Sequence, residues 1–480
     1  MSTTWQEQIN LLLQQKKFAD ALPLAEQELN EFKTVENLRT VIAIAIEAKL
    51  FKAAYFYLEQ LDANVLHDAS SYFFKALLFE KQGQSDAAIS HYKIAFAINP
   101  ANNQAFTNIK RLKGKSIADD QEQFDVVLCT GGIFFEKKFN ANTLNERALG
   151  GSESALIYVA QALKNQGLKV AVFCNCDQPG QHQGVSYFEI SEFAYRHALN
   201  QFPNIIATRF ADPFLGNLNP KARHTLWLHD DAFTEVYRNF SPQNYRIDDV
   251  LFLSQSHQKR WQERFPDWTN SRFHQTTNGF DPNLFFPIPN PQSKKILFAS
   301  RPERGLTTAV KVLENLRKQD PDYELLCCTY TQKENFEDDE SYQAVQNALQ
   351  TEGVRFLGSL AKPEFAKVMQ SCRYLLHPNS LQNLETSCIV AIEAQACGVP
   401  VICQDGGALK ETIQHNVTGL VLPRSENQTE AANALTKSIQ ELDQDPKKHS
   451  TLSKNAIKWA NENYKWEDVV RKWRESVIQE

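Results

Sequence analysis

The stretch from Leu384 to Pro423 constrains the fold of this chain more than any other. It contains two carboxylates, Glu385 and Glu393, with seven residues between them, and the small and apolar residues around Glu393 are typical of a buried helix. A glycine and a proline then end that helix, and the apolar run 401–403 predicts a short strand that leads into a Gly-Gly turn. This order predicts one unit of a parallel α/β sheet, with its polar groups at the edge where such sheets bind ligands.

The sub-motifs of this stretch follow one another as Glu-x7-Glu, Ala-x3-Gly-x-Pro-Val, Gly-Gly-x2-Glu and Gly-Leu. In this order they resemble the donor-binding half of the retaining glycosyltransferases of family four. The resemblance implies the GT-B fold, in which two Rossmann-like domains face a cleft that holds a nucleotide sugar. It assigns Glu393 to the ribose hydroxyls and Glu385 to the transferred sugar. It also implies retention of the anomeric configuration, with no metal or other cofactor.

Residues 293–450 form the second, donor-binding domain in this interpretation. A buried strand at 294–300 leads into Arg301 and Arg304 at the start of a helix, and both a bidentate guanidinium and a helix N-terminus favour anions. We therefore expect both arginines to neutralise the leaving diphosphate, although a surface pair of arginines is the alternative. The family carries a lysine in this region where the present chain has Arg304. The remaining donor-binding candidates of this domain are His377 and the helix-start residues Thr386, Ser387 and Cys388.

Residues 124–285 show the same α/β pattern and form the first Rossmann-like domain. Gly151 and Ser152 open a helix between two predicted strands, where backbone N–H groups can meet a diphosphate or a sugar. Most Gly-Gly turns before helices are only turns, but this one resembles the GGxE loop of the family. His229 ends the predicted strand 224–230 and is a catalytic candidate, the alternative being a structural histidine. Asn278 lies in an NGFD turn that resembles the end of the first domain in the family.

Residues 1–112 carry a weak internal repeat. Ala21, Ala54 and Ala88 recur at spacings of 33 and 34 residues in similar helical frames, and the last frame fits the tetratricopeptide pattern. Small residues at these positions let paired helices approach closely, and about three stacked repeats are expected. Such an array offers a groove to a protein partner. The alternative is a helical cap that stabilises the next domain or a homodimer.

Composition and the chain ends narrow the interpretation further. The net charge of −6 without a long basic run argues against nucleic-acid binding, and the nine cysteines lie mostly in strand-like runs typical of reduced thiols. We see no apolar signal segment and no run near ~18 apolar residues, so we expect a soluble, cytoplasmic protein without membrane contact. Residues 451–480 read as a helix whose tryptophans, spaced by seven, pack back on the first Rossmann-like domain.

Together these features predict a retaining hexosyltransferase that moves a sugar from a nucleotide sugar to a protein or protein-linked glycan recruited by the repeats. UDP-glucose is the expected donor because it is frequent in the family. One alternative is a polysaccharide or lipid-linked acceptor. Another is a repeat scaffold with a transferase-like domain that no longer turns over, which the joint presence of the candidate residues argues against. A sugar-nucleotide epimerase would share the fold, but would have no evident use for the repeats.

Overall fold

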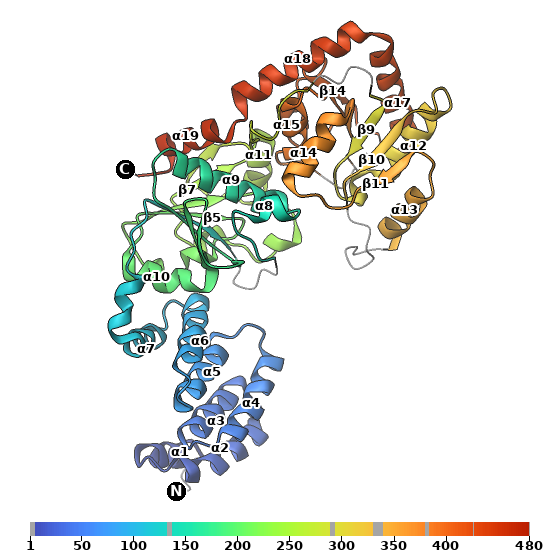
Figure 1. Cartoon of the computed structure of the whole chain (residues 1–480). Helices are drawn as coiled ribbons and strands as arrows, with labels where there is room; N and C mark the ends of the chain where they lie inside the picture. The colour runs from blue at the N-terminus through green and yellow to red at the C-terminus, as the bar shows by residue number, and fades with distance from the viewer. Residues whose placement is uncertain are drawn as a thin grey trace.

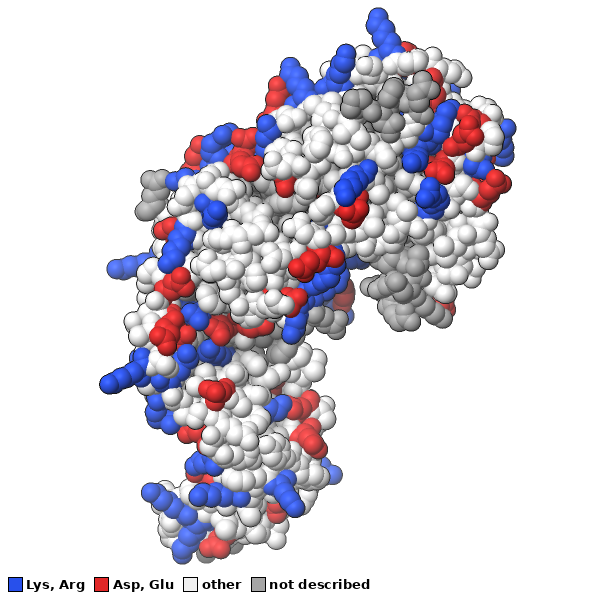
Figure 2. Space-filling model, viewed as in Figure 1, with Lys and Arg blue, Asp and Glu red and all other residues white. Residues whose placement is uncertain are grey.

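The structure is a computed structural model that describes residues 5–131, 137–288, 293–329, 339–379, 384–425 and 427–479. It consists of an N-terminal helical region, two α/β domains and a pair of C-terminal helices that run across both α/β domains (Figure 1). Basic and acidic side chains interleave over the face seen in Figure 2. None of the helices in the described part of the chain combines the length and apolar character needed to cross a membrane. The expected fold class, two Rossmann-like domains behind an all-helical region, is confirmed.

The first α/β domain is built on an eight-stranded sheet with the strand order β3-β4-β2-β1-β5-β6-β7-β8. Every pairing is parallel except that of β3 with β4. Alternate residues of β1 enter two different hydrophobic cores, because Val126 and Leu128 pack on one side and Val127 and Cys129 on the other. The strands are β1 (Val126–Thr130), β2 (Val170–Cys174), β3 (Gly180–His182), β4 (Val185–Glu189), β5 (Asn204–Thr208), β6 (Arg223–Trp227), β7 (Asp249–Phe252) and β8 (Arg272–Gln275). Its helices are α8 (Thr143–Glu146), α9 (Gly151–Asn165), α10 (Phe193–Asn200) and α11 (Gln255–Arg264).

The second α/β domain has a six-stranded, all-parallel sheet with the order β11-β10-β9-β12-β13-β14. Its strand β9 is also covered on both faces, with Leu297 in one core and Ile296 and Phe298 in the other. The strands are β9 (Lys295–Phe298), β10 (Glu324–Cys327), β11 (Val354–Phe356), β12 (Tyr374–His377), β13 (Val401–Gln404) and β14 (Gly419–Leu422). The helices are α12 (Leu306–Arg317), α13 (Asp339–Leu349), α14 (Lys362–Ser371), α15 (Ile389–Ala396), α16 (Leu409–Thr412) and α17 (Gln428–Gln444).

The N-terminal region contains seven helices in its described residues, and they repeat in structure as well as in sequence. Ala21, Ala54 and Ala88 are each fully buried at the fourth position of α2, α4 and α6. Two positions before each of these helices, one residue has a left-handed backbone conformation. These residues are Lys16, Lys49 and Gly83, with φ of 58°, 60° and 78°. A helix–turn–helix unit therefore recurs every 33 or 34 residues, while its assignment as tetratricopeptide stays a prediction. The helices are α1 (Trp5–Gln14), α2 (Phe18–Phe32), α3 (Val35–Glu47), α4 (Phe51–Asn64), α5 (Ala69–Lys81), α6 (Ser85–Ile98) and α7 (Asn103–Lys113).

Buried charges join the helical region to the first α/β domain. Lys93 of α6 lies 3.0 Å from Glu192, which also binds Arg196 at 2.7 Å. Arg196 in turn lies 3.1 Å from Asp120, whose other carboxylate oxygen accepts a hydrogen bond from the Tyr195 hydroxyl at 2.8 Å. The polar segment 113–123 between the two regions is thus anchored through its 3-10 helix Gly114–Asp120. The network fixes α6 against the first α/β domain.

The C-terminal helices connect the two α/β domains. Helix α18 (Pro446–Asn463) packs on the second domain, and α19 (Trp466–Ser476) packs on α9 of the first. Trp466 and Trp473 lie in a core of the first domain, whereas Trp459 packs against a core of the second. Between the helices, the Tyr464 carbonyl accepts the backbone N–H of Phe280 at 2.9 Å, next to the point where the chain first enters the second domain.

Candidate active site

The loop that carries Glu385 is held by the Gly-Gly turn that follows β13. Ala408 N–H donates to the Glu385 carbonyl at 2.7 Å, and Gly407 has a φ of +61°. A Cβ atom at Gly407 would lie 2.2 Å from that same carbonyl oxygen. Only glycine permits both the left-handed backbone and the close approach. The Gly406-Gly407 turn and the Glu385 loop, at opposite ends of the helix and strand between them, therefore hold one another in place.

The Glu385 carboxylate is the centre of a buried polar cluster. Its side chain is 9% exposed, and its Oε1 atom lies 2.9 Å from Arg304 Nη1 and 3.3 Å from His377 Nε2. Arg304 ends a short 3-10 helix after β9, and His377 ends β12, so neighbouring strand ends supply both. These three predicted site residues are brought together by the fold.

The donor atoms of His377, Glu385 and Cys388 all lie within 4.8 Å of one another, a spacing that a metal ion could use. Two features favour an ion-pair cluster instead. The Arg304 guanidinium already contacts Glu385 Oε1, and burial, followed by the Glu385 charge, raises the pKa of the Cys388 thiol well above its usual value. A soft metal binds the thiolate, so it would have to displace the Cys388 proton. Metal independence remains a prediction on this chemistry.

The second glutamate of the motif, Glu393, is 1% exposed and forms an ion pair with Lys362 at the start of α14. Burial raises the pKa of Glu393, and Lys362 opposes that shift. Sequence reasoning missed Lys362, because a lone lysine before a proline carries no recognisable signal. Lys362 contacts Oε1 of Glu393, whereas Oε2 is buried without a hydrogen-bond partner among the described residues, so the ion pair leaves one acceptor oxygen unused.

Four other predicted residues meet at the boundary between the α/β domains. Thr386 donates its hydroxyl to the His229 carbonyl at 2.8 Å. Asn278 donates its side-chain N–H to the Ser387 carbonyl at 2.8 Å, and its backbone N–H to the Ser387 hydroxyl oxygen at 3.2 Å. Burial, then Arg209, lowers the pKa of His229 well below its usual value. His229 is therefore a neutral imidazole near pH 7, suited to hydrogen bonding with a sugar hydroxyl.

Arg301 departs from the predicted arrangement. Its side chain is 63% exposed, and its Nη1 atom lies 3.9 Å from Glu303. The two arginines expected to act together are therefore in different surroundings, with Arg304 in the buried cluster and Arg301 at the surface. A phosphate role for Arg301 would require its side chain to change conformation.

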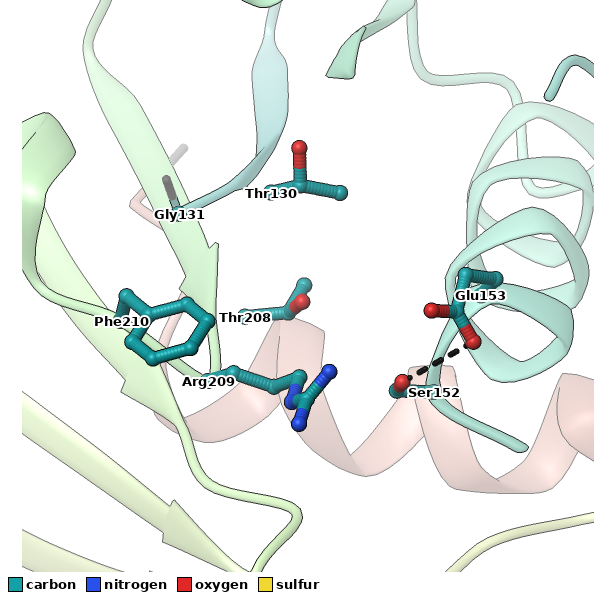
Figure 3. A pocket seen from close by; sticks show the side chains of 7 residues that line it. All are labelled: Thr130, Gly131, Ser152, Glu153, Thr208, Arg209 and Phe210. Carbon is teal, nitrogen blue, oxygen red and sulfur yellow. Dashed lines mark hydrogen bonds between the residues drawn. The ribbon is translucent and has the colours of Figure 1, made fainter. Parts of the chain in front are cut away.

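A pocket lies at the sheet edge of the first domain, next to the start of α9 (Figure 3). Gly151 at this helix start faces the second domain, since a Cβ there would lie 3.5 Å from Ile389 Cδ1 of α15. Sequence reasoning proposed Gly151 and Ser152 but missed Arg209, which follows β5 just as His229 follows β6. The lining residues are Thr130, Gly131, Ser152, Glu153, Thr208, Arg209 and Phe210.

Residues 282–459 match the family model described as "Glycosyl transferases group 1". Among curated proteins, the chain is similar to the D-inositol 3-phosphate glycosyltransferase of Jonesia denitrificans, with 32% identity over 144 residues. That match covers 29% of this chain and 33% of the relative. The chain thus spans about one third of the length of the first curated relatives it matches. Residues 282–459, which match the family model, contain Glu385 and Glu393.

Solved structures resemble a larger part of the chain. Sucrose-phosphate synthase from Thermosynechococcus elongatus aligns with a TM-score of 0.55 at 19% identity, over 74% of this chain and 98% of that one. Anabaena Alr3699/HepE in complex with UDP-glucose gives a TM-score of 0.55 at 19% identity, over 73% of this chain and 98% of that one. At this level of identity the similarity establishes the architecture. Behind its helical N-terminal region, the chain has the GT-B fold.

Proposed function

We propose that this chain is a metal-independent, retaining glycosyltransferase that takes a hexose from a nucleotide sugar. The observation that carries the proposal is the carboxylate of Glu385, which Arg304 binds and His377 approaches at neighbouring strand ends. It lies inside the segment that matches the group 1 glycosyltransferase model. UDP-glucose is the proposed donor, supported by the solved relative that contains it.

The chemistry needs negative charge to be stabilised on the departing diphosphate as the bond to the anomeric carbon breaks. Arg304 supplies a fixed guanidinium, and backbone N–H groups at the start of α15 add partial positive charge. Glu385 accepts hydrogen bonds from sugar hydroxyls, and neutral His229 binds another hydroxyl at the domain boundary. Reaction on one face of the sugar would convert an α-linked donor into an α-linked product.

The acceptor is proposed to be a protein or a protein-linked glycan carried by the helical region. A mostly apolar pocket lies where α6 meets the first domain, and it includes Ala97, Phe193, Pro213 and Leu215. Thr130 lines both this junction pocket and the polar pocket at the sheet edge. A carrier seated at the junction would therefore lie beside the acceptor side of the site. A polysaccharide or lipid-linked acceptor and an inactive scaffold remain the competing functions.

Donor hydrolysis and donor binding test the proposal. Full-length protein is offered UDP-, GDP- and ADP-sugars, and release of the nucleotide diphosphate is followed for wild type, Glu385→Gln and the control Glu352→Gln, whose side chain is 90% exposed. We expect slow hydrolysis of one donor, unchanged in the control and reduced at least about tenfold in Glu385→Gln. Absence of binding to every donor would favour the scaffold instead.

A further inference from the structure

We propose that Lys362 is a positioning residue of the donor site, which engages one oxygen of Glu393 and thereby leaves the other to accept a hydroxyl of the nucleotide ribose. The inference rests on the proposed transferase function and concerns a lysine that no sequence motif marks. Three observations carry it: an unused acceptor oxygen on a buried carboxylate, an ammonium held between aromatic rings, and a lysine placed against the dipole of its own helix.

The Glu393 carboxylate has one oxygen that remains available to a ligand. The side chain is 1% exposed, and its Oε1 atom is paired with Lys362 Nζ. Its Oε2 atom is buried without a hydrogen-bond partner in the part of the chain that the structure describes. An unpaired acceptor in a buried position is costly, and native structures contain few of them. A ligand hydroxyl would satisfy this atom, because an ionised carboxylate only accepts hydrogen bonds.

The pair lies where the two α/β domains meet. Helix α14, which begins at Lys362, contacts α8 of the first domain (Figure 1). Tyr158 belongs to α9 of the first domain, and burial, followed by the Glu393 charge, raises the pKa of this tyrosine well above its usual value. The Tyr158 hydroxyl is likewise buried with no hydrogen-bond partner among the described residues. Each domain therefore contributes an unpaired polar atom to the boundary at which the nucleotide sugar is proposed to bind.

The Lys362 ammonium is held in place by more than its ion pair. Its Nζ atom lies 5.6 Å from the ring centroids of both Phe285 and Phe365, within the range of a cation–π contact. The two rings meet edge to face, with their centroids 6.3 Å apart. The Gln370 side chain of α14 donates to the carbonyls on either side of Phe285, at 3.1 and 3.0 Å. Packing therefore defines where the ammonium lies, and with it the oxygen of Glu393 that the ammonium engages.

Lys362 also occupies an unfavourable place in its helix. It is the first residue of α14, where the partial positive charge of the helix N-terminus disfavours a cation and favours an acidic residue. The lysine is stabilised here by a carboxylate from another helix, Glu393 of α15. A residue that local preference disfavours and a buried tertiary partner retains is typical of a functional position.

The ion pair also acts on the protonation state of Glu393. Burial raises the pKa of this carboxylate, and Lys362 opposes the shift. Two other titratable side chains sense the Glu393 charge: Tyr158 across the boundary and Cys397 in the turn after α15. Burial raises the pKa of both, so neither loses its proton near pH 7. Lys362 therefore favours the ionised form of Glu393, which makes the stronger, charge-assisted hydrogen bond to a hydroxyl.

Nucleotide binding to the full-length chain tests the inference. Calorimetry identifies the diphosphate that binds best among UDP, GDP and ADP, and its 2′-deoxy and 3′-deoxy forms are then titrated. In the wild type, loss of the hydroxyl that donates to Glu393 should raise Kd at least about tenfold. In Lys362→Met, which keeps an unbranched apolar stem against the two rings but lacks the cation, that ratio should fall to about threefold or less. Lys367→Met removes an exposed lysine of the same helix and should retain the wild-type ratio.

An unchanged ratio in Lys362→Met overturns the inference, because an ion pair that only holds α14 to α15 would weaken the ribose and deoxyribose nucleotides alike. Lys362→Arg is the second variant should Lys362→Met fail to fold. It keeps the charge, but its planar fork can bind both oxygens of Glu393 and should therefore lower the same ratio. A wild-type ratio in Lys362→Arg would also refute the proposal.

The pH dependence of binding gives a further readout. Without the cation, Glu393 should take up its proton at a higher pH, and the neutral acid binds the hydroxyl less strongly. On acidification, Kd for the ribose nucleotide in Lys362→Met should therefore begin to rise at least about one pH unit above the point at which it rises in the wild type. Coincident profiles would contradict the assigned role of Lys362.

Donor hydrolysis separates this inference from the proposed function. Nucleotide binding with the expected change of ratio, but without hydrolysis of any nucleotide sugar, upholds the role of Lys362 and refutes the transferase. Hydrolysis of a donor with an unchanged ratio in Lys362→Met upholds the transferase and refutes the role of Lys362. A chain that binds none of the three diphosphates overturns both.

Discussion

The carboxylate of Glu411, in the second α/β domain, accepts the backbone N–H of Gln255 in the first at 2.8 Å. Its other oxygen accepts the next N–H of α11, that of Ser256, also at 2.8 Å. Helix α11 begins at Gln255, so a side chain of one domain caps a helix of the other. The contact lies on the same boundary as the Thr386–His229 hydrogen bond.

Replacing Glu411 with glutamine should weaken the closed arrangement of the two domains. Loss of a charged cap costs about 1 kcal/mol, and glutamine retains only one acceptor oxygen. We expect the KM for the donor to rise several-fold, with a larger radius of gyration in small-angle scattering. Glu462→Gln, on the exposed side of α18, is the control. Unchanged scattering and unchanged KM would show that the cap does not hold the domains together.

Arg304→Ala should lower kcat/KM for donor hydrolysis by about 10²–10³, because a fixed cation aimed at developing charge is lost. Arg304→Lys should recover only part of that loss, since an ammonium cannot reproduce the planar fork. Arg355→Ala removes a surface arginine of the same domain and should leave the rate unchanged. Steady-state measurement of kcat/KM for donor hydrolysis in the three variants tests this prediction. Full activity in Arg304→Ala would place diphosphate stabilisation elsewhere.

Gly407→Ala should destabilise the second domain and abolish hydrolysis together. The new methyl group would meet the Glu385 carbonyl, and a left-handed alanine adds strain of about 1–2 kcal/mol. Gly358→Ala is a matched control, because Gly358 also has a positive φ, of 73°, but no atom lies within 4 Å of its added Cβ. The difference in melting temperature between the two variants measures the steric part. An equal loss of melting temperature in both variants would mean that the close contact of Gly407 with the Glu385 carbonyl contributes little to stability.

The contact between the helical region and the first domain should weaken in acid. Lys93 and Arg196 outweigh burial and hold the pKa of Glu192 below its ordinary value of 4.5; Lys113, Tyr195 and Arg196 do the same for Asp120, ordinarily 3.8. A lowered folded pKa means that the stabilisation is complete above the ordinary pKa and is lost as pH falls through the lower folded value. The protection of the α6 and α10 amides against hydrogen exchange, corrected for the intrinsic exchange rate at each pH, should therefore fall below about pH 4 in the wild type.

Asp120→Asn supplies the comparison for that experiment. Its exchange in α6 and α10 should already be faster at pH 7, and the remaining dependence on pH should be flatter. Equal protection at pH 7 and pH 3 in the wild type, after correction for the intrinsic exchange rate, would show that the buried charges contribute little to the contact.

The motif between Leu384 and Pro423 and the strands near it could be predicted because their sequence signals are local. Glu385, Gly407 and the intervening helix lie within one stretch, and parallel strands then place their polar ends at one edge. Lys362 and Asp120 could not be found in this way. Each gains its role from partners at least thirty residues away in the sequence, Glu393 for the one and Tyr195 and Arg196 for the other.

Arg209 and Arg301 show two ways in which prediction from sequence fails to give the position of a side chain. Arg209 follows a predicted strand and could have been proposed, but nothing in the sequence indicates its left-handed backbone, which arises from contacts with Trp227 and Tyr237. Arg301 carries the expected residue type in the expected place, yet its side chain lies at the surface. The sequence pattern predicts which strand end carries a residue, whereas the direction of its side chain depends on tertiary contacts.

The two chain crossings between the α/β domains lie side by side, joined by the hydrogen bond from Phe280 to Tyr464. Both linkers between the α/β domains therefore pass through one small region of the molecule. The Glu411 cap on α11 lies beside these crossings, because the Tyr464 hydroxyl donates to the Glu411 carbonyl at 3.5 Å. Any rotation of one α/β domain against the other would therefore turn about a region that already holds both linkers and an interdomain helix cap.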